Sequence, residues 1–143
     1  MKINVQKVHE NATLPTYANP GDGGADLYAV EDFYISPESV VSVGTGVAVE
    51  IPPGHAGFIL PRSGLGLKHG IGVVNAPGLV DSGYRGELRI SLINHSGMAG
   101  YHGKAGDRIA QLVVQKVEQP EFVEAKALGE SVRGKSGFGS TGR

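Results

Sequence analysis

Apolar and polar residues alternate in short runs along this chain, and no stretch keeps the period of about 3.6 residues that marks an amphipathic helix. The first run, KINVQKV, places Ile3 and Val5 on one face of an extended segment and charged or amide side chains on the other. Similar runs follow as VVSVGTGVAVEI, GHAGFILP, GIGVVNAPGLV, GELRISLINH and DRIAQLVVQKVE, with turn sequences rich in glycine, proline and asparagine between them. The pattern predicts an all-β sandwich or jelly roll.

Three local features add detail to this prediction. One short helix is predicted at residues 63–69, although its two internal glycines weaken it. The tetrapeptide Asp81-Ser82-Gly83-Tyr84 predicts a turn before a strand that begins at about Glu87. Together with the NAPG turn upstream, it predicts a hairpin around Leu79 and Val80 whose backbone groups are available to read the edge of a planar ligand.

Composition narrows the class of protein. A chain of 143 residues favours one domain, and a net charge of -1 argues against a broad basic face for duplex nucleic acid or for an anionic membrane. The absence of cysteine excludes disulfides, thiolate nucleophiles and thiolate metal sites. No stretch is long and apolar enough to predict a signal peptide or a membrane span, so we expect a cytoplasmic protein.

Few residues point to chemistry on their own. The five histidines lack metal-ligand spacing, and no G-x-S-x-G sequence is present. The segment PRSGLG combines a basic residue, a hydroxyl and a glycine amide, which suits phosphate oxygens, whereas Ser63 has no evident base beside it as a nucleophile. Asp81 has an ordinary interpretation as a turn residue, Tyr84 as a partly buried aromatic and Gln111 as a strand amide.

The final segment reads GESVRGKSGFGSTGR, in which residues 129–136 match the phosphate-loop pattern G-x-x-x-x-G-K-S. That loop requires a helix after it, and the seven residues that follow Ser136 include three glycines. The match is therefore accidental. Two interpretations of the segment stay open, a frayed chain end or a flexible flap that closes on an anion carrying a flat group.

Taken together, these stretches resemble the five motifs of the homotrimeric dUTP diphosphatase (dUTPase) family. They occur in the family's order as GADLYA, PRSGLG, NAPGLVDSGYRG, GDRIAQLV and RGKSGFGSTG, and they span nearly the whole chain. The resemblance implies a single-domain jelly-roll or β-clip fold over residues 1–132, assembled as a homotrimer. Residues 133–143 would form a flexible glycine-rich flap that closes over a neighbouring subunit's active site.

The activity that the resemblance implies is hydrolysis of dUTP to dUMP and pyrophosphate, which keeps uracil out of DNA and supplies dUMP for thymidylate synthesis. Asp81 would be the general base that deprotonates the water attacking the α-phosphorus. Arg133 would act like an arginine finger delivered by another subunit. Mg²⁺ on the triphosphate would stabilise charge on the leaving pyrophosphate, and Asp26 would contact that ion only through water.

The resemblance assigns the remaining substrate contacts in three groups. Tyr84 would pack under the deoxyribose and exclude a 2′-hydroxyl. Uracil would be read by Asn75, Gly78 and Leu79. The phosphate chain would be held by Ser63, Gly64 and Gln111, with Arg62 orienting the site or bridging subunits. In the flap, Phe138 would stack on uracil, Ser140 and Thr141 would bind the γ-phosphate with Arg133, and Gly139 would also contact the substrate.

One position departs from the family's flap pattern, because Ser136 stands where a second glycine is usual, and Lys135 is an extra charge of unassigned role. If that position needs a positive φ, serine would slow or weaken closure without changing the reaction. Two alternatives to the diphosphatase are a dCTP deaminase-like enzyme on the same fold, and a catalytically silent nucleotide-binding trimer with a regulatory role.

Overall fold

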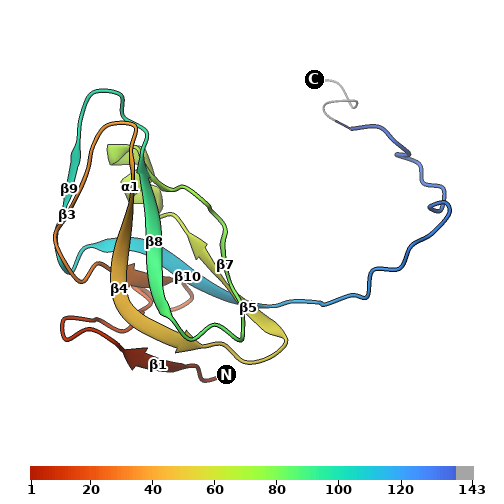
Figure 1. The fold of residues 1–143 in the computed structure, drawn as a ribbon, viewed down its shortest axis with the longest axis horizontal. Helices are drawn as coiled ribbons and strands as arrows, with labels where there is room; N and C mark the ends of the chain where they lie inside the picture. The colour runs from red at the N-terminus through yellow and green to blue at the C-terminus, as the bar shows by residue number, and fades with distance from the viewer. Residues whose placement is uncertain (138–143) are drawn as a thin grey trace.

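A computed structural model describes residues 1–137, and within them the chain forms ten strands and one short helix (Figure 1). In chain order the elements are β1 (Asn4–Lys7), β2 (Ala25–Tyr28), β3 (Phe33–Ile35), β4 (Val40–Glu50), β5 (His55–Leu60), α1 (Ser63–His69), β6 (Ile71–Val73), β7 (Gly78–Val80), β8 (Glu87–Asn94), β9 (Tyr101–Gly103) and β10 (Arg108–Lys116). The predicted all-β class is therefore confirmed. The helix predicted at residues 63–69 is also confirmed, and it ends at Gly70, whose φ of 66° is left-handed.

The strands form two four-stranded antiparallel sheets, in the orders β1-β4-β8-β6 and β2-β10-β5-β7, and a small β3-β9 ladder. The core lies between the two large sheets and takes side chains from both. On β8, Leu88, Ile90 and Leu92 are buried and alternate with more exposed residues, as the sequence pattern predicts. From the second sheet, Ile59 and Leu112 join the same cluster.

The predicted hairpin around Leu79 and Val80 is wrong as a strand pairing. β6 pairs with β8 in one sheet, whereas β7 pairs with β5 in the other, so residues 75–86 cross from one sheet to the other and back. Val80 is buried and Leu79 is exposed, which is the alternation of an outer strand that packs one face on the core. The turn at Asp81–Tyr84 and the strand start at Glu87 are confirmed.

A bulge in β4 interrupts its pairing with β8. Gly44 pairs with Arg89, but the next pair joins Ala48 and Glu87, so β4 carries extra residues at this point. The buried Thr45 hydroxyl donates to the Leu88 carbonyl at 2.6 Å, and the Gly46 amide donates to the Glu87 carboxylate at 2.8 Å. The bulge thereby fixes the beginning of β8, which borders the candidate site.

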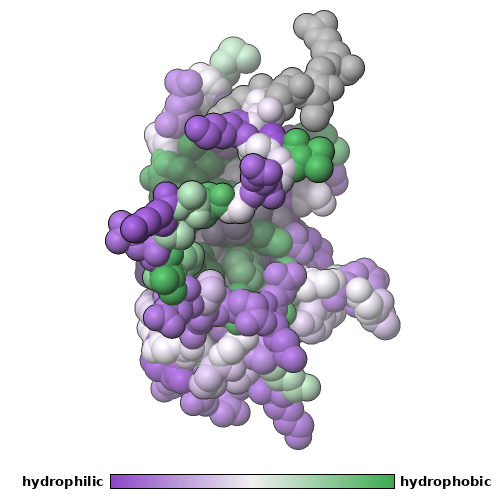
Figure 2. All heavy atoms as spheres, turned by 90° about the vertical axis from the view of Figure 1, so that its right-hand side faces the viewer, coloured by the Kyte–Doolittle hydropathy of each residue, from purple (hydrophilic) through white to green (hydrophobic). Residues whose placement is uncertain are grey.

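After β10 the chain leaves the sheets, and residues 117–137, here called the arm, extend away from the body (Figure 1). Phe122 and Leu128 of the arm are 94% and 91% exposed. Figure 2 views the side of the molecule from which the arm departs, and apolar side chains are visible there among polar ones. The predicted domain boundary at residues 132–133 falls within this arm, and the flap residues from Phe138 onward lie outside the described residues.

Arg133 and Ser136 close a turn in the arm, in which the Ser136 amide donates to the Arg133 carbonyl at 3.1 Å. The left-handed residue of this turn is Gly134, with φ of 52°, and Ser136 is not among the residues with positive φ. The strain expected of serine is thus absent in this conformation of the arm. Within residues 1–137, no helix has the length and apolar character to cross a membrane, and the cytoplasmic location stays a prediction.

The buried side-chain amide of Asn94 links the end of β8 to the small β3-β9 ladder. Its Nδ2 donates to the carbonyls of Ile35 and Ala99, and its Oδ1 accepts from the Ser96 amide. Asn94→Ala leaves these groups without partners in a site with 1% exposure, so we expect the free energy of unfolding to fall by about 2–4 kcal/mol. Urea unfolding at one fixed protein concentration measures the change. Met98→Ala, on a 95% exposed side chain, is the control, and an equal loss in both variants would contradict the assignment.

Candidate active site

One cavity, of about 270 Å³, collects most of the residues predicted to read the base and the sugar. It is here called the Asp81 cavity, and it is lined by Ile59, Asn75, Gly78, Leu79, Val80, Asp81, Tyr84, Glu87, Leu88 and Arg89. This wall holds the predicted base Asp81, the predicted sugar contact Tyr84, and Asn75, Gly78 and Leu79 of the uracil group. Its floor is apolar where the core reaches the surface, and its rim carries charge.

Local sequence explains how Asp81 reaches the cavity. Val80 is buried at the end of β7, so the next residue leaves the sheet and its side chain is exposed to the cavity. The Tyr84 amide donates to the Asp81 carbonyl at 3.0 Å and closes the turn that the sequence predicts. A carboxylate held by its own backbone turn at the mouth of an apolar cavity can accept a proton from a bound water.

Two further side chains are fixed on this wall. The Tyr84 hydroxyl donates to the Glu87 carbonyl at 3.0 Å, which ties the ring to the start of β8. The Asn75 amide lies against Gly78, since a Cβ added to Gly78 would be 3.3 Å from Asn75 Nδ2. Beside them β7 is the outer strand of its sheet, so its backbone groups on the side away from β5 face outward. Amide and carbonyl groups of this kind can read the edge of a planar base.

A second hollow, of about 640 Å³, holds the residues predicted to bind phosphate. It is here called the Ser63 hollow, and Arg62, Ser63 and Gln111 line it together with His95. Gly64 is exposed next to Ser63 in the first turn of α1. The Gln111 amide donates through Nε2 to the Pro61 carbonyl at 2.9 Å, so it holds the beginning of the PRSGLG segment. The hollow thus combines a guanidinium, a hydroxyl and a loop held by a strand.

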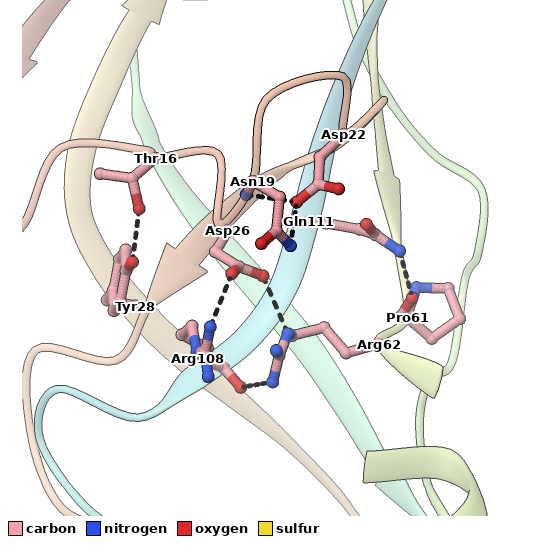
Figure 3. A network of polar contacts seen from close by, with 9 residues as sticks. All are labelled: Thr16, Asn19, Asp22, Asp26, Tyr28, Pro61, Arg62, Arg108 and Gln111. Atoms are coloured by element: carbon pink, nitrogen blue, oxygen red, sulfur yellow. Dashed lines mark hydrogen bonds and ion pairs between the residues drawn. The ribbon is translucent and has the colours of Figure 1, made fainter. Parts of the chain in front are cut away.

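Asp26 lies beside this hollow at the centre of a polar network (Figure 3). Asp26 is 7% exposed, and its carboxylate accepts from Arg62 Nε at 2.8 Å and from Arg108 Nη1 at 3.3 Å. Arg62 Nη1 also donates to the Arg108 carbonyl at 3.4 Å. Antiparallel pairing of β2 with β10 brings Asp26 opposite Gln111. The network therefore joins β2, β10 and the segment before α1 that carries Arg62. A buried carboxylate is stable here because two guanidinium groups compensate its charge.

The network bears on the predicted magnesium contact. Residues 1–137 contain no group of three or more metal-ligating side chains. The Asp26 carboxylate already forms ion pairs with the guanidinium groups of Arg62 and Arg108. A dication beside two guanidinium groups is repelled unless further negative charge arrives with it. The water-mediated contact between Asp26 and magnesium stays a prediction.

The two hollows share no lining residue, and Arg133 is on the arm, away from the body (Figure 1). Within residues 1–137, the predicted site residues therefore fall in or beside two hollows, with one residue on the arm. Four predicted flap residues lie outside the described residues, namely Phe138, Gly139, Ser140 and Thr141.

Sequence reasoning missed four polar residues near these hollows: Glu87, Arg89, His95 and Arg108. The alternation in GELRIS indicated that Glu87 and Arg89 share a strand face. The link between Arg108 and Asp26 depends on strand register, which no local pattern gave.

Comparison with known proteins gives a consistent result. The family model described as dUTPase matches residues 10–142. The deoxyuridine 5′-triphosphate nucleotidohydrolase of Thermobifida fusca (strain YX) is 49% identical over 142 residues, which make up 99% of this chain and 79% of that protein. The protein of the same name from Nautilia profundicola is 46% identical over 143 residues and covers 100% of both chains.

Solved structures agree with the fold. The dUTPase of Staphylococcus bacteriophage 80alpha, in complex with dUPNHPP, gives a TM-score of 0.93 with 28% identity, and the match covers 99% of each chain. A mutant dUTPase from phage phi11 of S. aureus, described as coordinating a structural Mg(II) ion, gives a TM-score of 0.81 with 28% identity. That match covers 89% of this chain and 98% of the phage chain.

The Asp26 network predicts unequal effects for two carboxylate variants. Asp26→Asn keeps the shape of the side chain but removes the buried charge that pairs with Arg62 and Arg108, so we expect a loss of about 1–3 kcal/mol in the free energy of unfolding. Glu50→Gln removes an exposed pair with Arg85 at 3.4 Å and is expected to cost less than about 1 kcal/mol. Urea unfolding compares the two, and an equal or larger loss for Glu50→Gln would refute the prediction.

Proposed function

The chain belongs to the dUTPase family and hydrolyses dUTP, and on that premise we propose that Asp81 is the base and that dUMP and pyrophosphate are the products. One observation carries the proposal. Asn75, Gly78, Leu79, Asp81 and Tyr84 line a single cavity with an apolar floor and one free carboxylate at its mouth. Such a cavity suits a flat base and a sugar, with the reactive phosphorus close to the carboxylate.

The reaction in this proposal is an in-line displacement. Asp81 accepts a proton from a water molecule, the water oxygen bonds to the α-phosphorus, and the bond from that phosphorus to the α,β-bridging oxygen breaks. The electron pair leaves with pyrophosphate, and the proton later passes from Asp81 to solvent. A positioned general base contributes a factor of about 10²–10⁴ to the rate. The rest comes from holding the phosphate chain in line and stabilising its charge.

Base and sugar selection follow from the walls of the Asp81 cavity. Asn75 and the backbone at Gly78 and Leu79 donate to or accept from the edge of uracil, whose O4 accepts a hydrogen bond where the amino group of cytosine donates. Support comes from the position of the Asn75 amide against Gly78 and from the outer edge of β7. Tyr84 lies under the deoxyribose and leaves no space for a 2′-hydroxyl. Its hydroxyl tether to the Glu87 carbonyl supports a fixed ring.

The phosphate chain is bound, in this proposal, by the Ser63 hollow of a second subunit. Ser63, Gly64 and Gln111 contact the phosphates, and Arg62 is oriented by Asp26. The separation of the two hollows within one chain supports a site that is shared in a homotrimer. A magnesium ion carried by the triphosphate would stabilise charge on the leaving pyrophosphate. Asp26 would hold this ion through water, because its carboxylate already pairs with two arginines.

A third subunit contributes the arm. Arg133 binds the γ-phosphate together with Ser140 and Thr141, Phe138 stacks on uracil, and Gly139 lies against the substrate. Support comes from the arm itself, which extends from the body and exposes Phe122 and Leu128 (Figure 1). Apolar side chains of this size favour burial against another surface. The family match over residues 10–142, which includes the flap, favours this enzyme over a dCTP deaminase.

Asp81→Asn tests the proposed base. The substitution keeps size and polarity but removes the proton acceptor, so we expect turnover of dUTP to fall by about 10²–10⁴-fold. Binding of a non-hydrolysable dUTP analogue should change little, because the cavity walls are intact. Pyrophosphate release and isothermal titration calorimetry give the two values. Turnover close to that of wild type would remove Asp81 from the mechanism.

Truncation before Arg133 tests the arm. Phosphoryl-transfer enzymes lose a factor of about 10³–10⁵ without their arginine finger, so the shortened chain should retain little activity. Its oligomeric state should persist, because residues 117–132 and both sheets remain. Size-exclusion chromatography with light scattering reports the assembly, and pyrophosphate release reports turnover. A fully active truncated protein would assign the flap no role in the reaction.

A further inference from the structure

The Tyr84 ring lies directly on the backbone of Gly86. A Cβ added to Gly86 would be 2.4 Å from the Tyr84 hydroxyl oxygen, 2.6 Å from Cζ and 3.0 Å from Cε2. These distances are shorter than ordinary contact, so the ring occupies the space that any side chain at position 86 would need. The absence of a side chain at Gly86 is therefore what allows the ring to occupy this position.

The surface under the ring is rigidly held. The Tyr84 hydroxyl donates to the Glu87 carbonyl, and the Glu87 carboxylate accepts from the Gly46 amide at 2.8 Å and pairs with Arg89 at 3.1 Å. Arg89 in turn donates to the Ser42 hydroxyl at 3.1 Å and to the Ser42 carbonyl at 3.0 Å. The β4 bulge thus fixes the residue to which Tyr84 is tethered. The depth of the cavity at the ring depends on this arrangement.

We propose that Gly86 is a specificity-determining residue, because it sets the height of the Tyr84 ring and thereby the clearance below the sugar. The inference rests on the proposed role of Tyr84 as the gate against ribonucleotides. An added methyl group requires the ring to move by about 1 Å to reach ordinary contact, from 2.4 Å toward 3.4 Å. A shift of about 1 Å in the ring changes the space available to the 2′-hydroxyl of a ribonucleotide, and that space decides whether UTP is excluded.

Gly86→Ala changes the ring and spares the fold. Gly86 has no positive φ, so alanine meets no backbone strain there. Tyr84 is 47% exposed, so its ring can tilt or swing away without disturbing the core. Gly83 is a matched control in the same turn, since an added Cβ there meets no atom within 4 Å and its φ is not positive. Both variants add one methyl group, and only one displaces the ring.

The experiment compares kcat/KM for dUTP and for UTP in wild type, Gly86→Ala, Gly83→Ala and Tyr84→Ala. We expect Gly86→Ala to lower kcat/KM for dUTP on the order of ten- to a hundredfold, because a shift of about 1 Å in a positioning group has effects of that size. In the same variant, we expect the ratio of kcat/KM for dUTP to kcat/KM for UTP to fall. Its melting temperature stays within about 3 °C of wild type. Calorimetry with dUpNHpp shows weaker binding to Gly86→Ala than to Gly83→Ala.

Different outcomes would contradict the role of Gly86 and the role of Tyr84 as the gate against ribonucleotides. A Gly86→Ala protein whose dUTP/UTP ratio and analogue affinity match those of Gly83→Ala would overturn the role of Gly86. Wild-type protein that hydrolyses dUTP and UTP equally, or a Tyr84→Ala variant with an unchanged ratio, would instead overturn the gate itself. A crystal structure of Gly86→Ala with the Tyr84 ring unmoved from its wild-type position would also contradict the inference, whatever the kinetics.

Discussion

The exposure of the arm is the physical constraint on which the function of this chain depends. Phe122, Val123 and Leu128 project from a segment that leaves the body after β10, and large apolar side chains in water favour burial at about 25 cal/mol per Å². Because the arm extends away from its own sheets, a second subunit is the natural surface to cover it. In the proposed homotrimer, the flap that carries Arg133 would then reach the site of a neighbouring chain.

The division of the site follows from the same architecture. One end of the sandwich holds the Asp81 cavity, where the segment between β6 and β8 crosses between sheets. The Ser63 hollow is lined by residues of α1, β6 and β10, and it lies beside a buried carboxylate that two arginines compensate. Each half is fixed by its own hydrogen bonds and is formed without the other. In the proposed homotrimer, these preorganised halves would meet between subunits and reduce the reorganisation that phosphoryl transfer otherwise requires.

Much of this arrangement was predictable from sequence, and the remainder depends on register. Alternating runs located the strands, and the turn chemistry of Asp81–Tyr84 located the cavity wall, because both signals are local. The placement of β6 and β7 in different sheets, and the pairing of Arg108 with Asp26, depend on contacts between segments far apart in the chain. No local pattern encodes these. The relation between Tyr84 and Gly86 depends on a side-chain direction, which spacing alone does not give.

The central claim is that Asp81 and the flap act in one site from different subunits. The most direct measurement mixes two inactive chains, Asp81→Asn and a truncation before Arg133, by refolding them together and assaying pyrophosphate release from dUTP. If the claim holds, each mixed trimer contains one site with an intact Asp81 and an intact flap, and activity recovers to on the order of a quarter of wild type. A mixture that stays as inactive as its two components, although mixed trimers form, would contradict the account.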